Sequence, residues 1–158
     1  MPSVTYRIAT LSDLPSLTEV MTRAFDDDAW RYLGLDRGGP PGYDNGDFFR
    51  RWLFSDAPTE GYVIELDGLV VGGMIVWVFP EQEFRLGTLF VDVDVQDRGI
   101  GTGAWEFLRD RYPQARRWVL DTPVWSVRNH RFYEKCGFSR TRQEGDGVEF
   151  RRDMPAHA

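Results

Sequence analysis

The stretch of sequence from Leu89 to Gly103, which reads LFVDVDVQDRGIGTG, decides the fold of this chain. Alternating apolar residues up to Val93 predict a β-strand, and the helical spacing of apolar residues begins near Gly99. Glycines between the two elements allow a tight turn, and the N–H groups in the first turn of a helix have no intrahelical partner. Because the positive end of the helix dipole lies at the same place, the stretch predicts a site for an anion, most often a phosphate.

Several interpretations of these glycines compete. A Walker loop requires a lysine directly after its last glycine, and no lysine lies near this turn. The dinucleotide fingerprint requires Gly-x-Gly-x-x-Gly, whereas this chain has glycines at 99, 101 and 103. Two interpretations remain: a phosphate turn of the form Gln-x-x-Gly-x-Gly that begins at Gln96, and a turn that serves only to pack strand against helix.

A second block, NHRFYEKCGF from Asn129 to Phe138, begins 33 residues after Gln96. This block and the turn QDRGIG at residues 96–101 resemble the two sequence motifs of the GNAT acetyltransferase superfamily, in the same order and at the expected separation. The distinctive identities lie within residues 89–138, while the order of predicted elements agrees over nearly the whole chain.

The resemblance implies acetyl-CoA as the cofactor and no metal. It implies that the end of a strand at residues 84–93 pairs with the pantetheine arm through Val91 and Val93, although many relatives have proline at the position of Val93. Asn129 would hydrogen-bond the same arm, and Tyr133 would lie near the sulfur. Backbone N–H groups would hold the pyrophosphate, and the resemblance assigns them to Gln96, Arg98, Gly99, Ile100, Gly101, Thr102 and Gly103.

The remaining sequence predicts one domain over residues 3–153, with elements in the order β-α-α-β-β-β-α-β-α-β-β. Alternation predicts strands, the i, i+3, i+4 spacing predicts helices, and Asp67-Gly68 predicts a hairpin turn. This order implies an α/β fold: a mixed central sheet with an antiparallel meander and helices on both faces. The predicted strands are 3–9, 62–66, 70–79, 84–93, 118–120 and two around 145–147, and the predicted helices are 12–24, 48–54, 99–112 and 127–136.

Composition excludes several classes of protein. With 158 residues, 42% apolar and 15% aromatic, the chain can bury the core of one domain. The net charge of −6 argues against a nucleic-acid-binding protein, because phosphate contacts need clustered cations. No stretch approaches about 18 consecutive apolar residues, and the N-terminus lacks the apolar core of a secretion signal, so we expect a soluble cytoplasmic protein without a membrane partner.

Cys136 and His130 lie near Tyr133, but the sequence does not favour a functional role for either. Cys136 is the only cysteine, which excludes an intramolecular disulfide, and we expect it in the core. His130 has no second histidine or carboxylate at metal-ligand spacing, so we expect it at the surface and not as a ligand.

The resemblance and elementary chemistry together imply direct transfer, in which a neutral primary amine attacks the acetyl carbonyl. The N–H near Val91 would polarise that carbonyl, and the phenol of Tyr133 would act as the general acid toward the departing thiolate. Glu83, Asp92 and Asp121 lie near the ends of predicted strands and are candidate bases, although each also suits an ordinary structural position, and a water chain could replace them.

The acceptor is expected to be a primary amine of a small molecule or peptide. In the GNAT superfamily, which this sequence resembles, the segment after the first helix and the loop after the fifth strand line the acceptor site. The resemblance therefore makes Trp30, Tyr32 and Trp125 candidate lining residues. Residues 1–95 carry 7 basic and 16 acidic side chains, whereas residues 96–152 carry 12 basic and 8 acidic ones. This asymmetry favours a cationic acceptor.

A second function from a different class stays open. A GNAT-like site can bind an acyl-CoA without transferring its acyl group, so the chain could be a non-catalytic sensor or regulatory module. The presence of both Asn129 and Tyr133 favours the enzyme, because binding alone needs no proton donor beside the sulfur. The resemblance also allows a homodimer.

Overall fold

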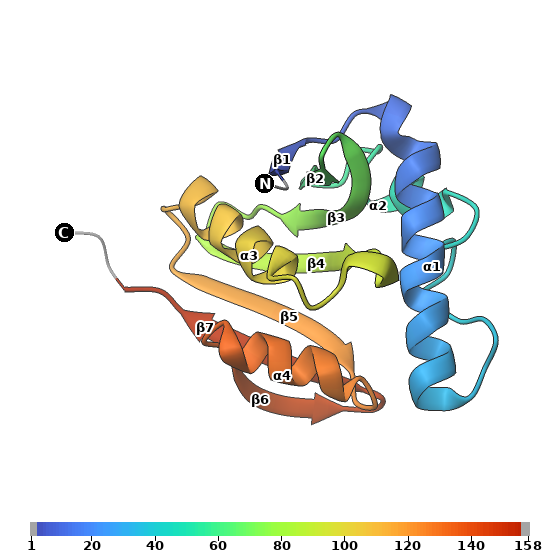
Figure 1. The fold of residues 1–158 in the computed structure, drawn as a ribbon. Coiled ribbons are helices and arrows are strands. Elements are labelled where there is room, and N and C mark those ends of the chain that lie inside the picture. The colour runs from blue at the N-terminus through green and yellow to red at the C-terminus, as the bar shows by residue number, and fades with distance from the viewer. Residues whose placement is uncertain (1–2, 156–158) are drawn as a thin grey trace.

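A seven-stranded β-sheet organises residues 3–155, the part of the chain that this computed structural model describes (Figure 1). Element order agrees with the sequence prediction, and the single-domain α/β architecture is confirmed. The strands are β1 Val4–Ile8, β2 Thr59–Leu66, β3 Leu69–Trp77, β4 Glu83–Val91, β5 Arg117–Pro123, β6 Ser139–Glu144 and β7 Gly147–Asp153. The helices are α1 Leu14–Leu33, α2 Asp47–Trp52, α3 Ile100–Arg111 and α4 Val127–Lys135, and the two 3-10 turns are η1 Leu11–Asp13 and η2 Val93–Val95.

The sheet is mixed, with the strand order β1-β2-β3-β4-β5-β7-β6. Neighbouring strands are antiparallel except β4 and β5, which are parallel. The β2–β3 hairpin turns at Asp67 and Gly68, whose φ angles of 50° and 85° are those that a two-residue turn requires and that Asp-Gly tolerates well. The predicted meander is therefore present as β1 to β4.

The strands β4 and β5 separate soon after they begin. Three residue pairs at the start of β4 match it to β5: Glu83 with Arg117, Phe84 with Trp118, and Arg85 with Val119. Beyond Arg85, the edge of β4 that faces β5 has no strand partner, while β5 stays paired with β7 along its whole length. The sheet thus opens in its middle, between the later halves of two adjacent parallel strands.

A β-bulge in β4 lies at the start of this opening. Ile75 pairs with Thr88 and Val76 pairs with Leu86, so Gly87 is an extra residue without a match on β3. Such a bulge bends a strand and increases its twist. A side chain at Gly87 would also lie 2.9 Å from the indole nitrogen of Trp77, which favours glycine there. The bulge provides a local reason for β4 to diverge from β5.

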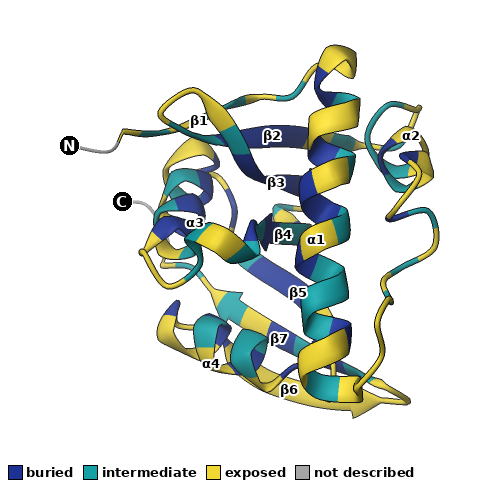
Figure 2. Ribbon diagram, turned by 45° about the vertical axis from the view of Figure 1, so that its right-hand side comes forward, coloured by how far each residue is buried: buried dark blue, intermediate teal, exposed yellow. Residues whose placement is uncertain are grey.

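Helices cover both faces of the sheet and divide the core into two clusters (Figure 2). On one face, α1 and α2 pack Leu17, Met21 and Phe49 against the sheet. On the other face, α3 and α4 pack against it through a cluster that includes Trp105 and Tyr133. The predicted placement of helices on both faces is confirmed.

Helix α1 is longer than the sequence predicts. The prediction ends it near Ala24, but the helix continues to Leu33 and ends where Gly34 adopts a left-handed φ of 68°. The acidic run remains helical because each carboxylate has a partner. Asp26 accepts from the Tyr43 hydroxyl, Asp27 pairs with Arg31, and Asp28 pairs with Arg128.

Strand β4 is shorter than predicted, because it ends at Val91 and Val93 belongs to the turn η2. Asp92 causes this change of direction. Its carboxylate accepts from the backbone N–H of Asp94 and forms a 2.6 Å ion pair with Arg23 of α1, while its own N–H donates to Val71. A buried carboxylate held in this way anchors the end of the strand to α1.

Candidate active site

The turn between β4 and α3 leaves backbone donors free. Gly99 precedes α3 with a left-handed φ of 79°, and no side chain caps the helix. The N–H groups of Ile100, Gly101 and Thr102 therefore have no intrahelical acceptor and lie at the positive end of the helix dipole. This geometry suits an anion, as the sequence predicts.

Gln96 connects this turn to the end of the strand. Its side-chain Nε2 donates to the carbonyl of Val91 across 2.9 Å. Asp97, the next residue, takes a left-handed φ of 64°, which places a compact loop between Gln96 and Gly99. The glutamine of the Gln-x-x-Gly-x-Gly pattern thus has a structural role: its side-chain hydrogen bond holds the loop that carries the free backbone N–H groups.

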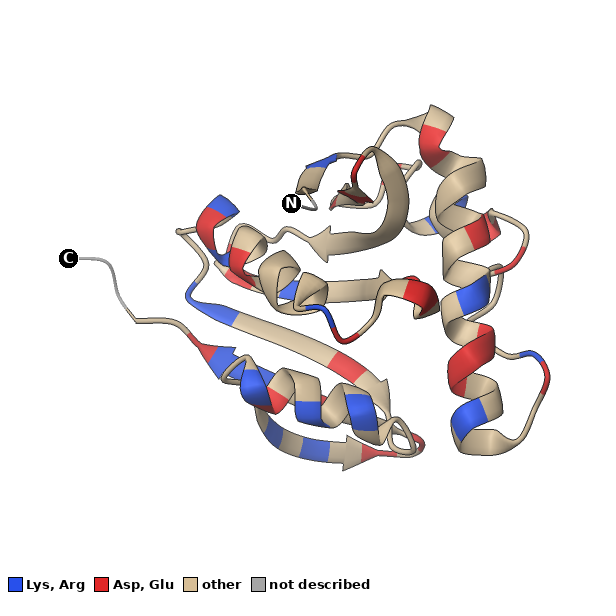
Figure 3. Cartoon of the chain, in the orientation of Figure 1, with Lys and Arg blue, Asp and Glu red and all other residues tan. Residues whose placement is uncertain are grey.

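A first cavity of about 540 Å³ lies over this turn, between α1, α3, α4 and the end of β4. Besides Gln96, Ile100 and Thr102, its lining includes three basic side chains of α4: Arg128, Arg131 and Lys135. Their spacing of three and then four residues puts them on one side of the helix. Figure 3 shows the Lys and Arg positions of α4 as blue bands on its ribbon. An anion-binding turn facing a basic helix is well suited to a ligand that bears several phosphates.

A second cavity of about 500 Å³ lies on the other side of the opening between β4 and β5. Segments far apart in sequence enclose it: α1, the loop before α2, both separated strands, and the loop before α4. Its lining side chains are mostly apolar, and Asp121 is the one charged residue among them. Trp125 lies in its wall.

Tyr133 lies where the two cavities meet. Phe25, Leu89, Asn129 and Tyr133 line both cavities, so a group bound at Tyr133 is accessible from either side. The Tyr133 side chain is buried, which raises its pKa above the ordinary value of a tyrosine, with a smaller contribution from Cys136. The phenol is therefore neutral at physiological pH and can donate a hydrogen bond or a proton.

Contacts with β5 hold the beginning of α4 in place. Asn129 donates from Nδ2 to the Thr122 hydroxyl across 3.4 Å, and the His130 ring nitrogen Nε2 lies 2.9 Å from the Pro123 carbonyl. The expectation of an exposed His130 is wrong, because this hydrogen bond lets the ring be buried against Phe150. Cys136 is buried, as predicted.

Some residues that the resemblance assigns to the cofactor do not line the first cavity. The N–H of Gly103 already donates to the carbonyl of Gly99, and a side chain at Gly103 would lie 2.5 Å from the Tyr6 hydroxyl, so this glycine serves packing between α3 and β1. Arg98 is exposed, and Val93 lies in η2, both outside the cavity lining. The structure brings together Val91, Gln96, Gly99, Ile100, Gly101, Thr102, Asn129 and Tyr133.

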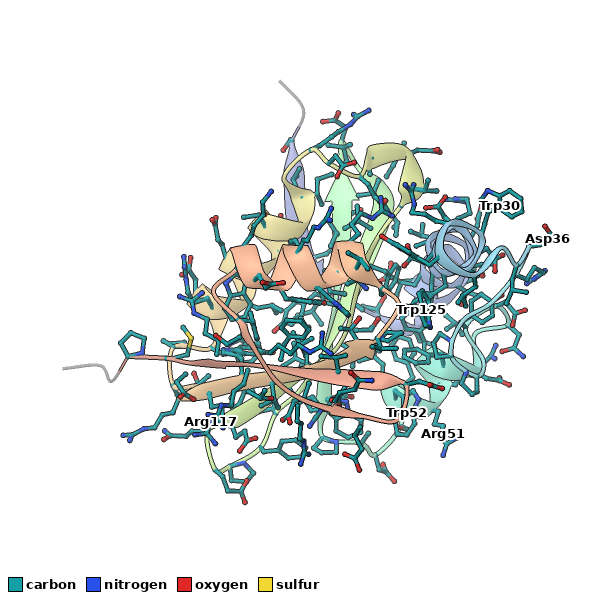
Figure 4. The ribbon with its side chains drawn as sticks, turned by 90° about the horizontal axis from the view of Figure 1, so that it is seen from below. Trp30, Asp36, Arg51, Trp52, Arg117 and Trp125 are labelled. Atoms are coloured by element: carbon teal, nitrogen blue, oxygen red, sulfur yellow. The ribbon has the colours of Figure 1, made fainter. Side chains whose placement is uncertain are left out.

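The three aromatic residues expected around the acceptor, Trp30, Tyr32 and Trp125, occupy different places; Figure 4 labels Trp30 and Trp125. Trp125 lines the second cavity. Tyr32 packs behind it, with ring centroids 5.9 Å apart, and its hydroxyl accepts a hydrogen bond from the N–H of Arg128. Trp30 is 62% exposed on the outer side of α1, away from both cavities.

The three candidate bases also lie in different parts of the fold. Asp121 lines the second cavity, where Arg85 donates to its carboxylate across 2.5 Å. Glu83 begins β4, at the end of the strand remote from the turn, 4.0 Å from Arg117. Asp92 is buried in its ion pair with Arg23. Asp121 is therefore the candidate that the fold brings to a cavity.

Asp28 lines the first cavity beside Arg128, although an acidic run such as Asp26-Asp27-Asp28 usually forms a solvated face. Burial raises the pKa of Asp28, and the Arg128 guanidinium opposes that shift. The basic positions of α4 were visible in the sequence as a helical stripe, but nothing local indicates that Asp28 faces them across a cavity.

The structure also bears on metals and membranes. Within residues 3–155, no three His, Cys, Asp or Glu side chains cluster as metal ligands. None of the helices in that part of the chain has the length and apolar character needed to span a membrane.

Comparison with known proteins agrees with this geometry. The chain is 31% identical over 139 residues to the uncharacterised protein YrkN of Bacillus subtilis, covering 87% of this chain and 74% of YrkN. An acetyltransferase from Thermus thermophilus shares the fold with a TM-score of 0.79 at 18% identity, covering 96% of this chain and 97% of that one. The ribosomal-protein-S18-alanine N-acetyltransferase of Escherichia coli does so with a TM-score of 0.75 at 16% identity, covering 99% and 97%.

A third solved structure, the PaiA N-acetyltransferase of Thermoplasma acidophilum in complex with coenzyme A, matches with a TM-score of 0.77 at 15% identity, covering 96% of this chain and 99% of that one. These identities establish the fold alone. The sequence model of the acetyltransferase (GNAT) family, however, matches residues 21–138, which include both motifs and most of the chain. On that match, the chain belongs to the GNAT acetyltransferase family.

Proposed function

We propose that this protein is an N-acetyltransferase that moves an acetyl group from acetyl-CoA to a primary amine of a small molecule or peptide. The observation that carries the proposal is the pair of cavities that meet at Tyr133. The first cavity suits a phosphate-bearing acetyl donor, and the second cavity would let an acceptor amine reach Tyr133 from the opposite side. Such an arrangement favours direct attack in a ternary complex.

The residues of the first cavity suit coenzyme A. The free amides of Ile100, Gly101 and Thr102 would bind the pyrophosphate, assisted by Arg131 and Lys135. The unpaired edge of β4 beyond Arg85 offers backbone groups to the amide-rich pantetheine arm, and Asn129 adds a side-chain partner. When bound, acetyl-CoA supplies an activated acyl carbonyl.

Tyr133 would protonate the departing thiolate. Its raised pKa keeps the phenol protonated until the thiolate forms. The backbone N–H near Val91 would polarise the carbonyl under attack. Both groups belong to elements that the core holds rigidly, α4 and the end of β4.

The amine must lose a proton before it attacks. Asp121 fits this role best of the three candidate bases, because only it lines the acceptor-side cavity, and its carboxylate must part from Arg85 to accept the proton. We expect Asp121→Asn to shift or remove the acidic limb of the pH–rate profile, and Glu83→Gln, its control at the remote end of β4, to leave that limb unchanged. If the acidic limb is unchanged in both variants, neither carboxylate is the base, and water accepts the proton of the acceptor ammonium.

The competing function is a non-catalytic acyl-CoA sensor. A thiol-release assay with acetyl-CoA and a broad panel of primary amines separates the two, with calorimetry to measure coenzyme binding. Acceptor-dependent release supports the enzyme, whereas tight binding of acetyl-CoA without release from any amine supports the sensor. A cytoplasmic location, a homodimer and the lack of nucleic-acid partners stay predictions of the sequence.

A further inference from the structure

The second cavity has an apolar wall. Apolar side chains from four parts of the fold surround it, and the remaining lining is backbone, glycine and hydroxyl-bearing residues apart from Asn129 and Asp121. Its volume of about 500 Å³ falls in the range of small-molecule sites. The apolar lining residues include Phe25, Leu33, Phe48, Leu86, Leu120 and Trp125.

The charges near this cavity are already paired. Asp121 is bound by Arg85, and its side chain is 60% exposed, so it lies toward solvent. Asp27 and Asp28 pair with Arg128, and Asp26 lies 3.9 Å from Arg37. The acidic half of the sequence therefore does not produce an anionic acceptor cavity, and the expectation of a cationic acceptor loses its basis.

A second charge on the acceptor would find no free counter-charge among the lining residues, because Asp121, the one charged residue there, is already bound by Arg85. Placing an ammonium or carboxylate against apolar walls costs free energy unless a counter-charge meets it, whereas burying a methylene gains free energy. We propose that the acceptor is a primary amine whose non-reacting part is apolar, and that this part binds the second cavity while the amine points to Tyr133. This inference rests on the proposed acetyl transfer.

Three amines with the same reactive end provide the test: hexylamine, 1,6-diaminohexane and 6-aminohexanoate. They differ at the far end alone, which is a methyl group, a cation or an anion. We expect kcat/KM for hexylamine to exceed that of both others by about tenfold or more, and butylamine to fall below hexylamine by about fourfold for each methylene removed. Equal or better activity with 1,6-diaminohexane or 6-aminohexanoate overturns the inference.

A pair of matched variants places the effect at this cavity. Leu33 lines it at the end of α1, whereas Leu35, two residues on, does not, and the two side chains are similarly exposed at 46% and 51%. Leu33→Lys should lower kcat/KM for hexylamine several-fold and reduce its advantage over 6-aminohexanoate. Leu35→Lys should change neither value. An equal effect of both variants means that general surface charge, and not the cavity, sets the preference.

Binding provides a readout that is independent of turnover. In calorimetry with the protein and coenzyme A, hexylamine should bind more tightly than butylamine and with a more negative heat capacity change, the mark of buried apolar surface. If no amine releases thiol, the proposed enzyme function is wrong, but the calorimetric comparison of hexylamine with butylamine still tests whether the second cavity is an apolar binding site. If thiol is released but binding does not improve with chain length, the enzyme stands and the apolar acceptor is wrong.

Discussion

The guanidinium of Arg128 at the start of α4 lies 3.4 Å from the carboxylate of Asp28 on α1, a contact between residues 100 positions apart. Asp27 lies 3.5 Å from the same guanidinium, and the neighbouring backbone N–H of Arg128 donates to Tyr32. These contacts join the second half of α1 to α4 beside the place where the two cavities meet. They explain why an acidic run remains helical and why the walls of both cavities keep their spacing.

The coupling between Asp28 and Arg128 should be stronger than that of an exposed pair. Its side chains are 20% and 31% exposed, so water screens it only in part. A double-mutant cycle with Asp28→Asn and Arg128→Gln should give a coupling free energy of about 1 kcal/mol in urea unfolding. The exposed Asp47–Arg50 pair is the control, with an expected coupling below about 0.5 kcal/mol. Equal couplings would show that the α1–α4 contact adds nothing beyond a surface pair.

Tyr133→Phe should lower kcat by about tenfold or more, because it removes the proton donor while keeping the ring that packs in the core. Coenzyme A affinity, measured by calorimetry, should stay close to that of the wild type. Because burial raises the pKa of Tyr133, kcat of the wild type should show no alkaline loss from phenol ionisation up to about pH 10. Tyr43→Phe is the control, since that hydroxyl donates to Asp26 and lines neither cavity. Near-normal turnover of Tyr133→Phe would remove this residue from the mechanism.

Gly103→Ala should destabilise the fold by about 1–3 kcal/mol, because the new methyl group would lie 2.5 Å from the Tyr6 hydroxyl. Adding Tyr6→Phe removes that oxygen and leaves the next ring atom 3.6 Å away. The double variant should therefore recover to within about 1 kcal/mol of the wild type, since alanine also favours the helix and the lost bond from Tyr6 to Ile100 is long at 3.2 Å. Thermal or urea unfolding of the three variants measures this, and simple additivity would contradict the packing role of Gly103.

Acid should destabilise the protein partly through Asp13. Hydrogen bonds from Arg7 lower the pKa of Asp13 to about 2, with help from the Thr10 N–H and against the effect of burial. A carboxyl whose pKa is lower in the folded state stabilises the fold above its unfolded pKa of about 4 and loses this contribution as the pH falls from about 4 to 2. Asp13→Asn should cost about 2 kcal/mol at pH 6 and progressively less below pH 4. Asp36→Asn, at an exposed position, should cost little at either pH, and a pH-independent cost of Asp13→Asn would refute the linkage.

The sequence by itself determined the order of the elements and the location of the anion site, because both depend on local chemistry. The Asp67-Gly68 turn, the alternation in β1 to β4 and the free amides before α3 follow from neighbouring residues. Local patterns also misled in places. Val93 alternates like a strand residue but lies in η2, because the ion pair of Asp92 with distant Arg23 ends β4 earlier.

Only the tertiary structure decided the shape of the site. The separation of β4 from β5 begins at a bulge at Gly87 that appears when β4 is matched to β3, and both cavities are bounded by α1 and α4, which Asp28 and Arg128 join. Tyr133 is recognisable in the sequence, but its position between two cavities is not. The physical reason is that periodicity reports which way a side chain points along its own element, whereas a cavity is bounded by elements whose spacing is set by contacts between residues far apart in the chain.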